Sequence, residues 1–126
     1  MVKTILVVDD DPDIIYTVKK RFEVIDKKYK ILGVNSGKKC IELLNNNKMP
    51  DLILLDVMMP ELSGWEVAAK LKKNPKWKDI PLIFLTAKTD SYSKTFGGIV
   101  AEDYITKPFE FIRLKESIDK LLCQKE

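Results

Sequence analysis

Residues 51–60, with the sequence DLILLDVMMP, constrain the fold of this chain more than any other stretch. Four consecutive apolar residues, 52–55, stand between two prolines. A short apolar run with such boundaries is typical of a strand buried on both faces, as in a parallel sheet covered by helices. Asp56 then lies at the carboxyl end of a central strand, where open α/β sheets bind ligands, although a turn-capping aspartate is equally compatible with this stretch alone.

Strand and helix patterns alternate five times along the chain. Strands are predicted over residues 4–9, 29–34, 52–55, 82–86 and 103–106. Helices are predicted from Asp11-Pro12, from Ser36, from the Ser63–Glu66 capping box, over residues 90–101 and from Glu110. The helix over 90–101 has the weakest signal, because two adjacent glycines lie within it. This order predicts one α/β domain over residues 1–126, a doubly wound (βα)5 fold with a five-stranded parallel sheet in the order 2-1-3-4-5.

The composition excludes several classes of function. The chain has no histidine, so a Ser-His-Asp triad, histidine metal ligation and histidine acid–base catalysis are all excluded. No apolar run approaches the length of a membrane span, so we expect no membrane insertion. Cys40 and Cys123 lack metal-ligand spacing, and we interpret them as reduced thiols in a cytoplasmic protein. A net charge of +3, from 22 basic and 19 acidic residues, is too small to predict direct contact with nucleic acid.

Polar residues follow or end most of the predicted strands. Asp9 and Asp10 come at the end of the first, Asp56 ends the third, Thr86 the fourth, and Lys107 follows the fifth. Because parallel strands end at one edge of a sheet, we expect the three carboxylates to converge there. They repel one another unless protonated or neutralised, and oxygen ligands without His or Cys suit Mg²⁺. Such a site can transfer a phosphoryl group, with an aspartate as the nucleophile.

Four strings resemble the receiver domains of two-component response regulators, and the chemotaxis-regulator type in particular. They are ILVVDDD at 5–11, DLILLDVMMPELSG at 51–64, LIFLTA at 82–87 and DYITKPF at 103–109. The resemblance covers essentially the whole chain and implies a flavodoxin-like fold. It implies that Asp56 is the phosphoacceptor and that Asp10, Asp56 and the backbone carbonyl of Met58 are direct Mg²⁺ ligands. Asp9 resembles the acidic neighbour that supports the metal, usually through water.

The same resemblance assigns three further roles. Thr86 and Lys107 are expected to contact the phosphoryl group through a hydroxyl and an ammonium. Tyr104 resembles the aromatic switch residue, whose rotamer follows Thr86. The Lys107–Pro108 peptide bond is expected to be cis.

The implied function is that of a phosphorylation-activated signalling receiver in a phosphorelay. A sensor histidine kinase or phosphotransfer protein donates the phosphoryl group, since the chain has no histidine of its own. The expected output is contact with an unidentified downstream protein, and a phosphorylation-dependent dimer is compatible with it. We expect self-dephosphorylation but no turnover of a separate substrate.

Two alternatives remain from other classes. An Mg²⁺-dependent phosphatase with an aspartyl nucleophile would need a second carboxylate two residues after Asp56, where Met58 stands. A degenerate receiver that serves only as a binding scaffold would not need Asp9, Asp10, Thr86 and Lys107 together with the phosphoacceptor.

Overall fold

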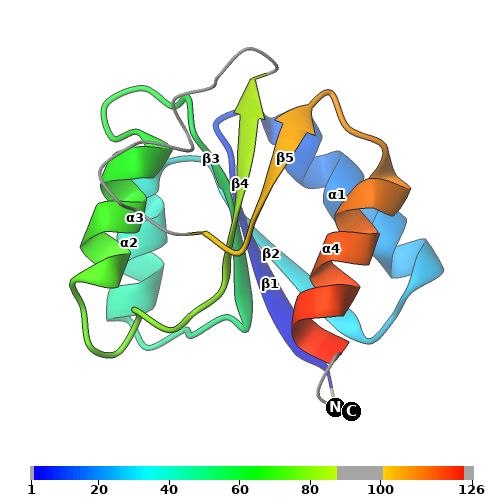
Figure 1. Ribbon diagram of the computed structural model, residues 1–126, viewed down its shortest axis with the longest axis horizontal. Helices are drawn as coiled ribbons and strands as arrows, with labels where there is room; N and C mark the ends of the chain where they lie inside the picture. The colour runs from blue at the N-terminus through cyan, green and yellow to red at the C-terminus, as the bar shows by residue number, and fades with distance from the viewer. Residues whose placement is uncertain (1, 88–100, 124–126) are drawn as a thin grey trace.

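The computed structural model describes residues 2–87 and 101–123, which form five strands and four helices (Figure 1). The strands are β1 (Lys3–Val8), β2 (Tyr29–Val34), β3 (Leu52–Asp56), β4 (Leu82–Ala87) and β5 (Asp103–Lys107). The helices are α1 (Pro12–Ile25), α2 (Gly37–Asn45), α3 (Gly64–Lys72) and α4 (Phe111–Cys123).

All neighbouring strands of the sheet are parallel, and their order is β2-β1-β3-β4-β5. This confirms the predicted strand order, with β3 in the centre and buried at every position. The register pairs Val8 with Leu55, and Asp56 with Leu85. At the far side of the sheet, Thr86 pairs with Thr106. The carboxyl ends of these strands therefore meet at one edge, as the strand pattern predicted.

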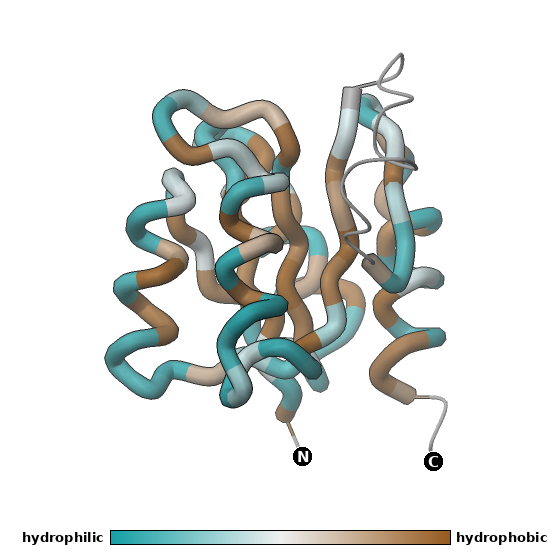
Figure 2. Tube along the Cα trace, turned by 60° about the vertical axis from the view of Figure 1, so that its left-hand side comes forward, coloured by the Kyte–Doolittle hydropathy of each residue, from teal (hydrophilic) through white to brown (hydrophobic). Residues whose placement is uncertain are grey.

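The helices cover both faces of the sheet. In Figure 1, α2 and α3 lie on one side of the strands, and α1 and α4 lie on the other. Alternate residues of each strand pack against opposite helix pairs: Leu6 and Val8 join the cluster under α2 and α3, whereas Ile5 and Val7 join the one under α1 and α4. In Figure 2, hydrophobic residues are concentrated along the strands, and hydrophilic residues lie on the outer turns of the helices.

The helix starts follow the local signals in the sequence. The Asp11 side chain accepts a hydrogen bond from the amide of Asp13, and Pro12 is the first helical residue of α1. Ser36 accepts from the amide of Lys39 at the start of α2. The capping box of α3 is complete, because Ser63 and Glu66 each accept a hydrogen bond from the backbone amide of the other.

One residue departs from the sequence prediction, and one predicted helix lies almost entirely outside the described residues. In the sequence, Ile25 follows Phe22 at helical spacing, which predicts that both lie on the buried face of α1, but Ile25 is 51% exposed. That end of the core is already closed by Phe22, whose ring meets Tyr29 and Phe111 edge to face. The helix predicted over 90–101 lies almost entirely outside the described residues. Within the described part of the chain, no helix has both the length and the apolar character needed to cross a membrane.

Candidate functional site

Three carboxylates meet where β1 and β3 end. Asp9 follows β1 and is fully buried, Asp56 is the last residue of β3 and is 4% exposed, and Asp10 is exposed. One oxygen from each side chain lies within 4.8 Å of the other two. Because β1 and β3 are hydrogen-bonded neighbours, the fold itself brings these aspartates together, as the sequence analysis predicted.

Lys107 is the positive counterpart of the buried carboxylates. Its Nζ atom lies 2.8 Å from Asp9 Oδ2 and 3.2 Å from Asp56 Oδ1. The Lys107–Pro108 peptide bond is cis, as expected. Backbone amides complete the arrangement: Asp11 donates to Asp9 Oδ1 at 2.9 Å, and Met58 donates to Asp56 Oδ1 at 3.3 Å. Each buried carboxylate is therefore held by the ammonium and by one amide.

The electrostatics of the site favour binding of a further cation. Burial raises the pKa of the Asp56 carboxyl to about 7, the negative charge of Asp9 adds to the rise, and Lys107 opposes it. Burial also acts to lower the pKa of Lys107, but its hydrogen bond to Asp9 and the two negative charges outweigh this, so its pKa lies above the usual value. Lys107 thus stays charged, yet it does not fully compensate for the crowded carboxylates.

Thr86 lies on β4, the strand next to β3, and Tyr104 lies on β5, the strand beyond β4. Thr86 is 5% exposed and follows Leu85, the residue paired with Asp56 in the register. Tyr104 is half-buried on β5 and pairs with Phe84. Thr86 therefore lies one residue beyond the rung that holds the central carboxylate, and Tyr104 lies beside the strand that carries Thr86.

A cavity of about 650 Å³ opens beside the carboxylates. It is lined by the three aspartates, Met58 and Lys107, and it continues along α1 past Ile14, Thr17 and Arg21 to Phe109 and Phe111. The guanidinium of Arg21 lies 4.8 Å from the centre of the Phe111 ring. This side of α1 was not predicted from the sequence to belong to the site, although residues 14, 17, 18 and 21 have the spacing of one helical stripe.

Gly64, the first residue of α3, is a second feature of the site that was not predicted from the sequence. Its amide donates to the carbonyl of Val57 at 2.9 Å. A Cβ atom at this position would overlap the carbonyl oxygen of Asp56 and lie 2.8 Å from the Cα atom of Val57. The start of α3 therefore rests directly on the backbone of Asp56, and only glycine permits this approach.

Comparison with known proteins agrees with this geometry. The family model of the response regulator receiver domain matches residues 5–119. The chain belongs to this family. Response regulator SaeR of Staphylococcus aureus (strain USA300) is 39% identical over 121 residues, which are 95% of this chain and 50% of SaeR. A probable cyclic di-GMP phosphodiesterase of Vibrio cholerae is 39% identical over 123 residues, which are 97% of this chain and 27% of that protein.

The receiver therefore spans half or less of these two curated relatives. Among solved structures, response regulator TrrA from Thermotoga maritima, in complex with Mg²⁺-BeF, is similar with a TM-score of 0.82 and 36% identity. That match covers 96% of this chain and all of the TrrA chain. The resemblance to receiver domains and the flavodoxin-like fold are thus confirmed, and the chain is a receiver of two-component signal transduction.

Proposed function

We propose that Asp56 of this receiver is the phosphoacceptor and that phosphorylation at Asp56 switches the binding of a downstream protein. The observation that carries the proposal is the position of Lys107, whose ammonium lies within 3.2 Å of both Asp56 and the fully buried Asp9. A lysine so placed can balance the charge of a phosphoryl group added to Asp56. Phosphoryl transfer depends mainly on positioning and charge neutralisation, which this arrangement supplies.

The donor in this proposal is a phosphohistidine of a sensor histidine kinase or phosphotransfer protein. One carboxylate oxygen of Asp56 forms a bond to phosphorus while the P–N bond to the histidine breaks. The electron pair of that bond stays on the imidazole nitrogen, which is left free to take up a proton. Lys107 holds the transferred group by charge, and the Thr86 hydroxyl donates a hydrogen bond to one of its oxygens.

The carboxylate cluster fits a magnesium ion. Its donors are oxygen atoms only, and the exposed Asp10 leaves the site accessible from solvent. Asp10, Asp56 and the Met58 carbonyl would hold the ion directly, and Asp9 would hold it through a water molecule. When bound, Mg²⁺ supplies positive charge that offsets the carboxylates and the phosphoryl oxygens. The Mg²⁺-BeF complex of TrrA supports this assignment by analogy.

The cavity along α1 supports a path for the donor. It begins at the acidic cluster and continues past Ile14, Thr17 and Arg21 between α1 and the start of α4. We infer that the histidine-bearing segment of the donor approaches through it.

On the output side, the Tyr104 side chain changes its rotamer with Thr86 when the phosphoryl group is present. The two conformations of the receiver differ in their affinity for the downstream protein.

A phosphatase with an aspartyl nucleophile is the less well supported function. The position that would carry its acid–base carboxylate holds Met58, whose side chain is 68% exposed and cannot transfer a proton. Continuous release of phosphate from a phosphomonoester, at a rate that Asp56→Asn abolishes, would favour the phosphatase over the receiver.

Mass spectrometry after incubation with acetyl phosphate and Mg²⁺ tests the proposal. We expect the wild type to gain one phosphoryl group and Asp56→Asn to gain none, with no labelling of either protein in excess chelator. Asp51→Asn is the matched control, because Asp51 precedes β3 at the opposite end and accepts a hydrogen bond from the Thr4 amide. Labelling of Asp56→Asn at the wild-type level would disprove the assignment.

A further inference from the structure

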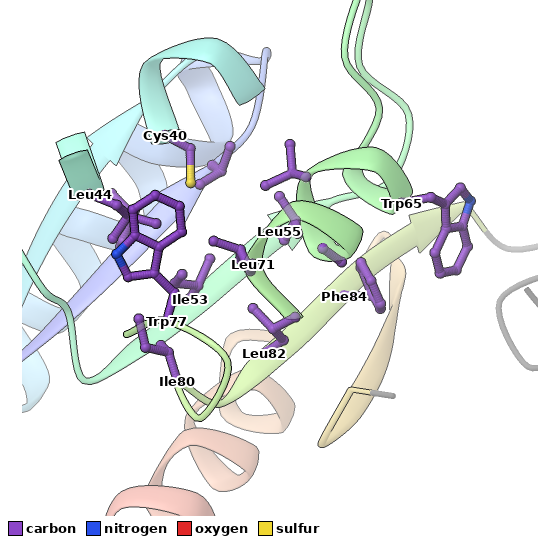
Figure 3. Packing of buried hydrophobic residues seen from close by; sticks show 14 of the residues in the cluster. Cys40, Leu44, Ile53, Leu55, Trp65, Leu71, Trp77, Ile80, Leu82 and Phe84 are labelled. Carbon is purple, nitrogen blue, oxygen red and sulfur yellow. The ribbon is translucent and has the colours of Figure 1, made fainter. Parts of the chain in front are cut away.

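Three aromatic rings form a row across the sheet between α3 and β5. The ring of Trp65, the second residue of α3, lies 4.6 Å from that of Phe84, measured between centroids. On β5, the ring of Tyr104 stacks on Phe84 with centroids 5.5 Å apart and an interplanar angle of 23°. Figure 3 shows Trp65 beside Phe84 at one end of the hydrophobic cluster, while Trp77 lies near Leu44 at the other.

At the Trp65 end of this row, the backbone of α3 contacts the backbone of Asp56 and Val57. Trp65 directly follows Gly64, which rests on the carbonyl of Asp56 and the Cα atom of Val57 with no room for a Cβ atom. The Gly64 amide also donates to the Val57 carbonyl at 2.9 Å. A displacement of the Asp56–Val57 backbone therefore has to move the first turn of α3, and with it Trp65.

The other end of the row is the half-buried ring of Tyr104. Phe84 is fully buried and is the cross-strand partner of Tyr104 in the β4–β5 register. Side chains alternate along a strand, so Thr86 shares the face of the sheet that carries Phe84. Close-packed interiors transmit displacement because they have few voids to absorb it. Thr86 and the aromatic row thus lie on the face of the sheet against which the Tyr104 ring stacks.

We propose that Trp65 and Phe84 are positioning residues that hold the Tyr104 ring and couple it to the backbone of Asp56. The inference rests on the proposed function and deepens it, because it identifies a connection between phosphorylation and Tyr104 in addition to Thr86. The Thr86 hydroxyl responds to the phosphoryl group, and the aromatic row sets the orientation from which Tyr104 follows. A row that served only as core packing would affect stability but not the response of Tyr104.

The test compares two buried tryptophans of the same cluster. Trp65 is 9% exposed and Trp77 is 7% exposed, but of these two tryptophans only Trp65 is paired with Phe84 among the described ring contacts. In ¹⁵N-labelled protein, the measured quantity is the chemical-shift change of the Tyr104 amide when Mg²⁺ and beryllofluoride are added. Each variant is also incubated with acetyl phosphate and Mg²⁺, and its mass is measured by mass spectrometry. This measures phosphorylation of Asp56 independently of the Tyr104 shift.

We expect Trp65→Leu and Phe84→Leu to lose more than half of the Tyr104 shift change while still accepting a phosphoryl group. Trp65→Phe keeps an aromatic ring against Phe84 and should retain most of the change, as should the control Trp77→Leu. Equal responses in Trp65→Leu and Trp77→Leu would overturn the inference and leave the proposed function intact. An unlabelled wild type would instead overturn the proposed function.

A reciprocal measurement leaves Trp65 in place. It therefore tests the coupling between Trp65 and Tyr104 even if Trp65→Leu does not fold. The chain has two tryptophans, and Trp77→Phe makes Trp65 the sole tryptophan, which can be excited apart from the tyrosines. We expect Mg²⁺ and beryllofluoride to change Trp65 fluorescence in this background and Tyr104→Leu to remove most of that change. A fluorescence change that is the same with and without the Tyr104 ring would show that the row does not couple the two residues.

Discussion

The ammonium group of Lys107 lies 2.8 Å from Oδ2 of Asp9, a carboxylate that is completely buried. The same ammonium is 3.2 Å from Asp56 Oδ1, so one lysine side chain, itself 25% exposed, serves two buried acids. Charges removed from water are tolerated only when they are paired. The pairing therefore stabilises the metal-free receiver and also leaves a cation where a phosphoryl group would be added.

Lys107→Met is expected to lower the free energy of unfolding by about 3 kcal/mol without Mg²⁺, because it leaves buried carboxylates unpaired. Added Mg²⁺ should restore part of this loss by placing another cation among them. Urea denaturation with Mg²⁺ and with chelator measures both effects. Lys115→Met is the matched control: Lys115 also bridges two aspartates, at 2.7 Å from Asp119 and 3.3 Å from Asp26, but Mg²⁺ should not restore its stability. Equal recovery in both variants would contradict the prediction.

Asp10→Ala is expected to make the metal-free protein more stable and to remove most of its gain from Mg²⁺. It deletes one of three carboxylates that lie within 4.8 Å, and with it a proposed metal ligand. With free Mg²⁺ at 100 times its dissociation constant, the wild type should gain about 2.7 kcal/mol. Thermal unfolding with and without Mg²⁺ measures the difference. Asp13→Ala, which removes a neighbouring exposed acid in the first turn of α1, should keep the wild-type gain.

Local signals were sufficient to predict most of the fold. Polar caps stand where helices begin, as at Ser36 and Ser63, and uninterrupted apolar runs mark the buried strands. The strand-end carboxylates followed from topology, because parallel strands must end at one edge. The convergence of Asp9, Asp10 and Asp56 was therefore predictable before any distance was known.

Contacts that depend on exact helix placement could not be predicted in the same way. The sequence shows a glycine at position 64 but not that α3 rests on the backbone of Asp56. Trp65, Phe84 and Tyr104 are far apart in the chain, and their ring contacts depend on where α3 crosses β4 and β5. Ile25 fitted the apolar period of α1 but is exposed, because periodicity does not reveal where the core beneath a helix ends.

The pH dependence of stability should reflect Asp103, which joins β5 to α4. Burial acts to raise its pKa, but hydrogen bonds from Arg113, Ser117 and the Tyr104 amide outweigh this and hold the pKa below its usual value. A depressed pKa contributes stability above the unfolded-state value near 4, which is lost as the pH falls through the folded-state value. Asp103→Asn should therefore cost about 1 kcal/mol at pH 7 and progressively less below about pH 4.

Urea midpoints measured from neutral to acidic pH check the Asp103 prediction. The partner variant Arg113→Gln removes the guanidinium, which donates to Asp103 at 3.1 Å and 3.3 Å. At pH 7 the double variant should lose less stability than the sum of the two single variants, because they share one interaction. A difference between wild type and Asp103→Asn that stays constant with pH would contradict this assignment.

Gly64→Ala should disturb the backbone of Asp56, the proposed phosphoacceptor, more than its stability cost alone suggests. The new Cβ atom would overlap the Asp56 carbonyl oxygen, and backbone atoms cannot rotate aside. We expect a loss of about 1–3 kcal/mol, as for other overpacked sites, and slower labelling of Asp56 by acetyl phosphate. Gly37→Ala is the matched control, since Gly37 is also the first residue of a helix and also follows a serine cap.

The Cβ atom in Gly37→Ala would approach two side-chain atoms, Val67 Cγ2 at 2.6 Å and Leu62 Cδ2 at 3.1 Å, and one backbone atom, the Leu62 carbonyl oxygen at 3.1 Å. Side chains can yield, and alanine is the better helix former, so this variant should lose less stability than Gly64→Ala. Its labelling rate should stay close to that of the wild type, because nothing in the crowding reaches Asp56. Equal labelling rates in Gly64→Ala and Gly37→Ala would show that the close approach of α3 to the Asp56 backbone does not position the proposed phosphoacceptor.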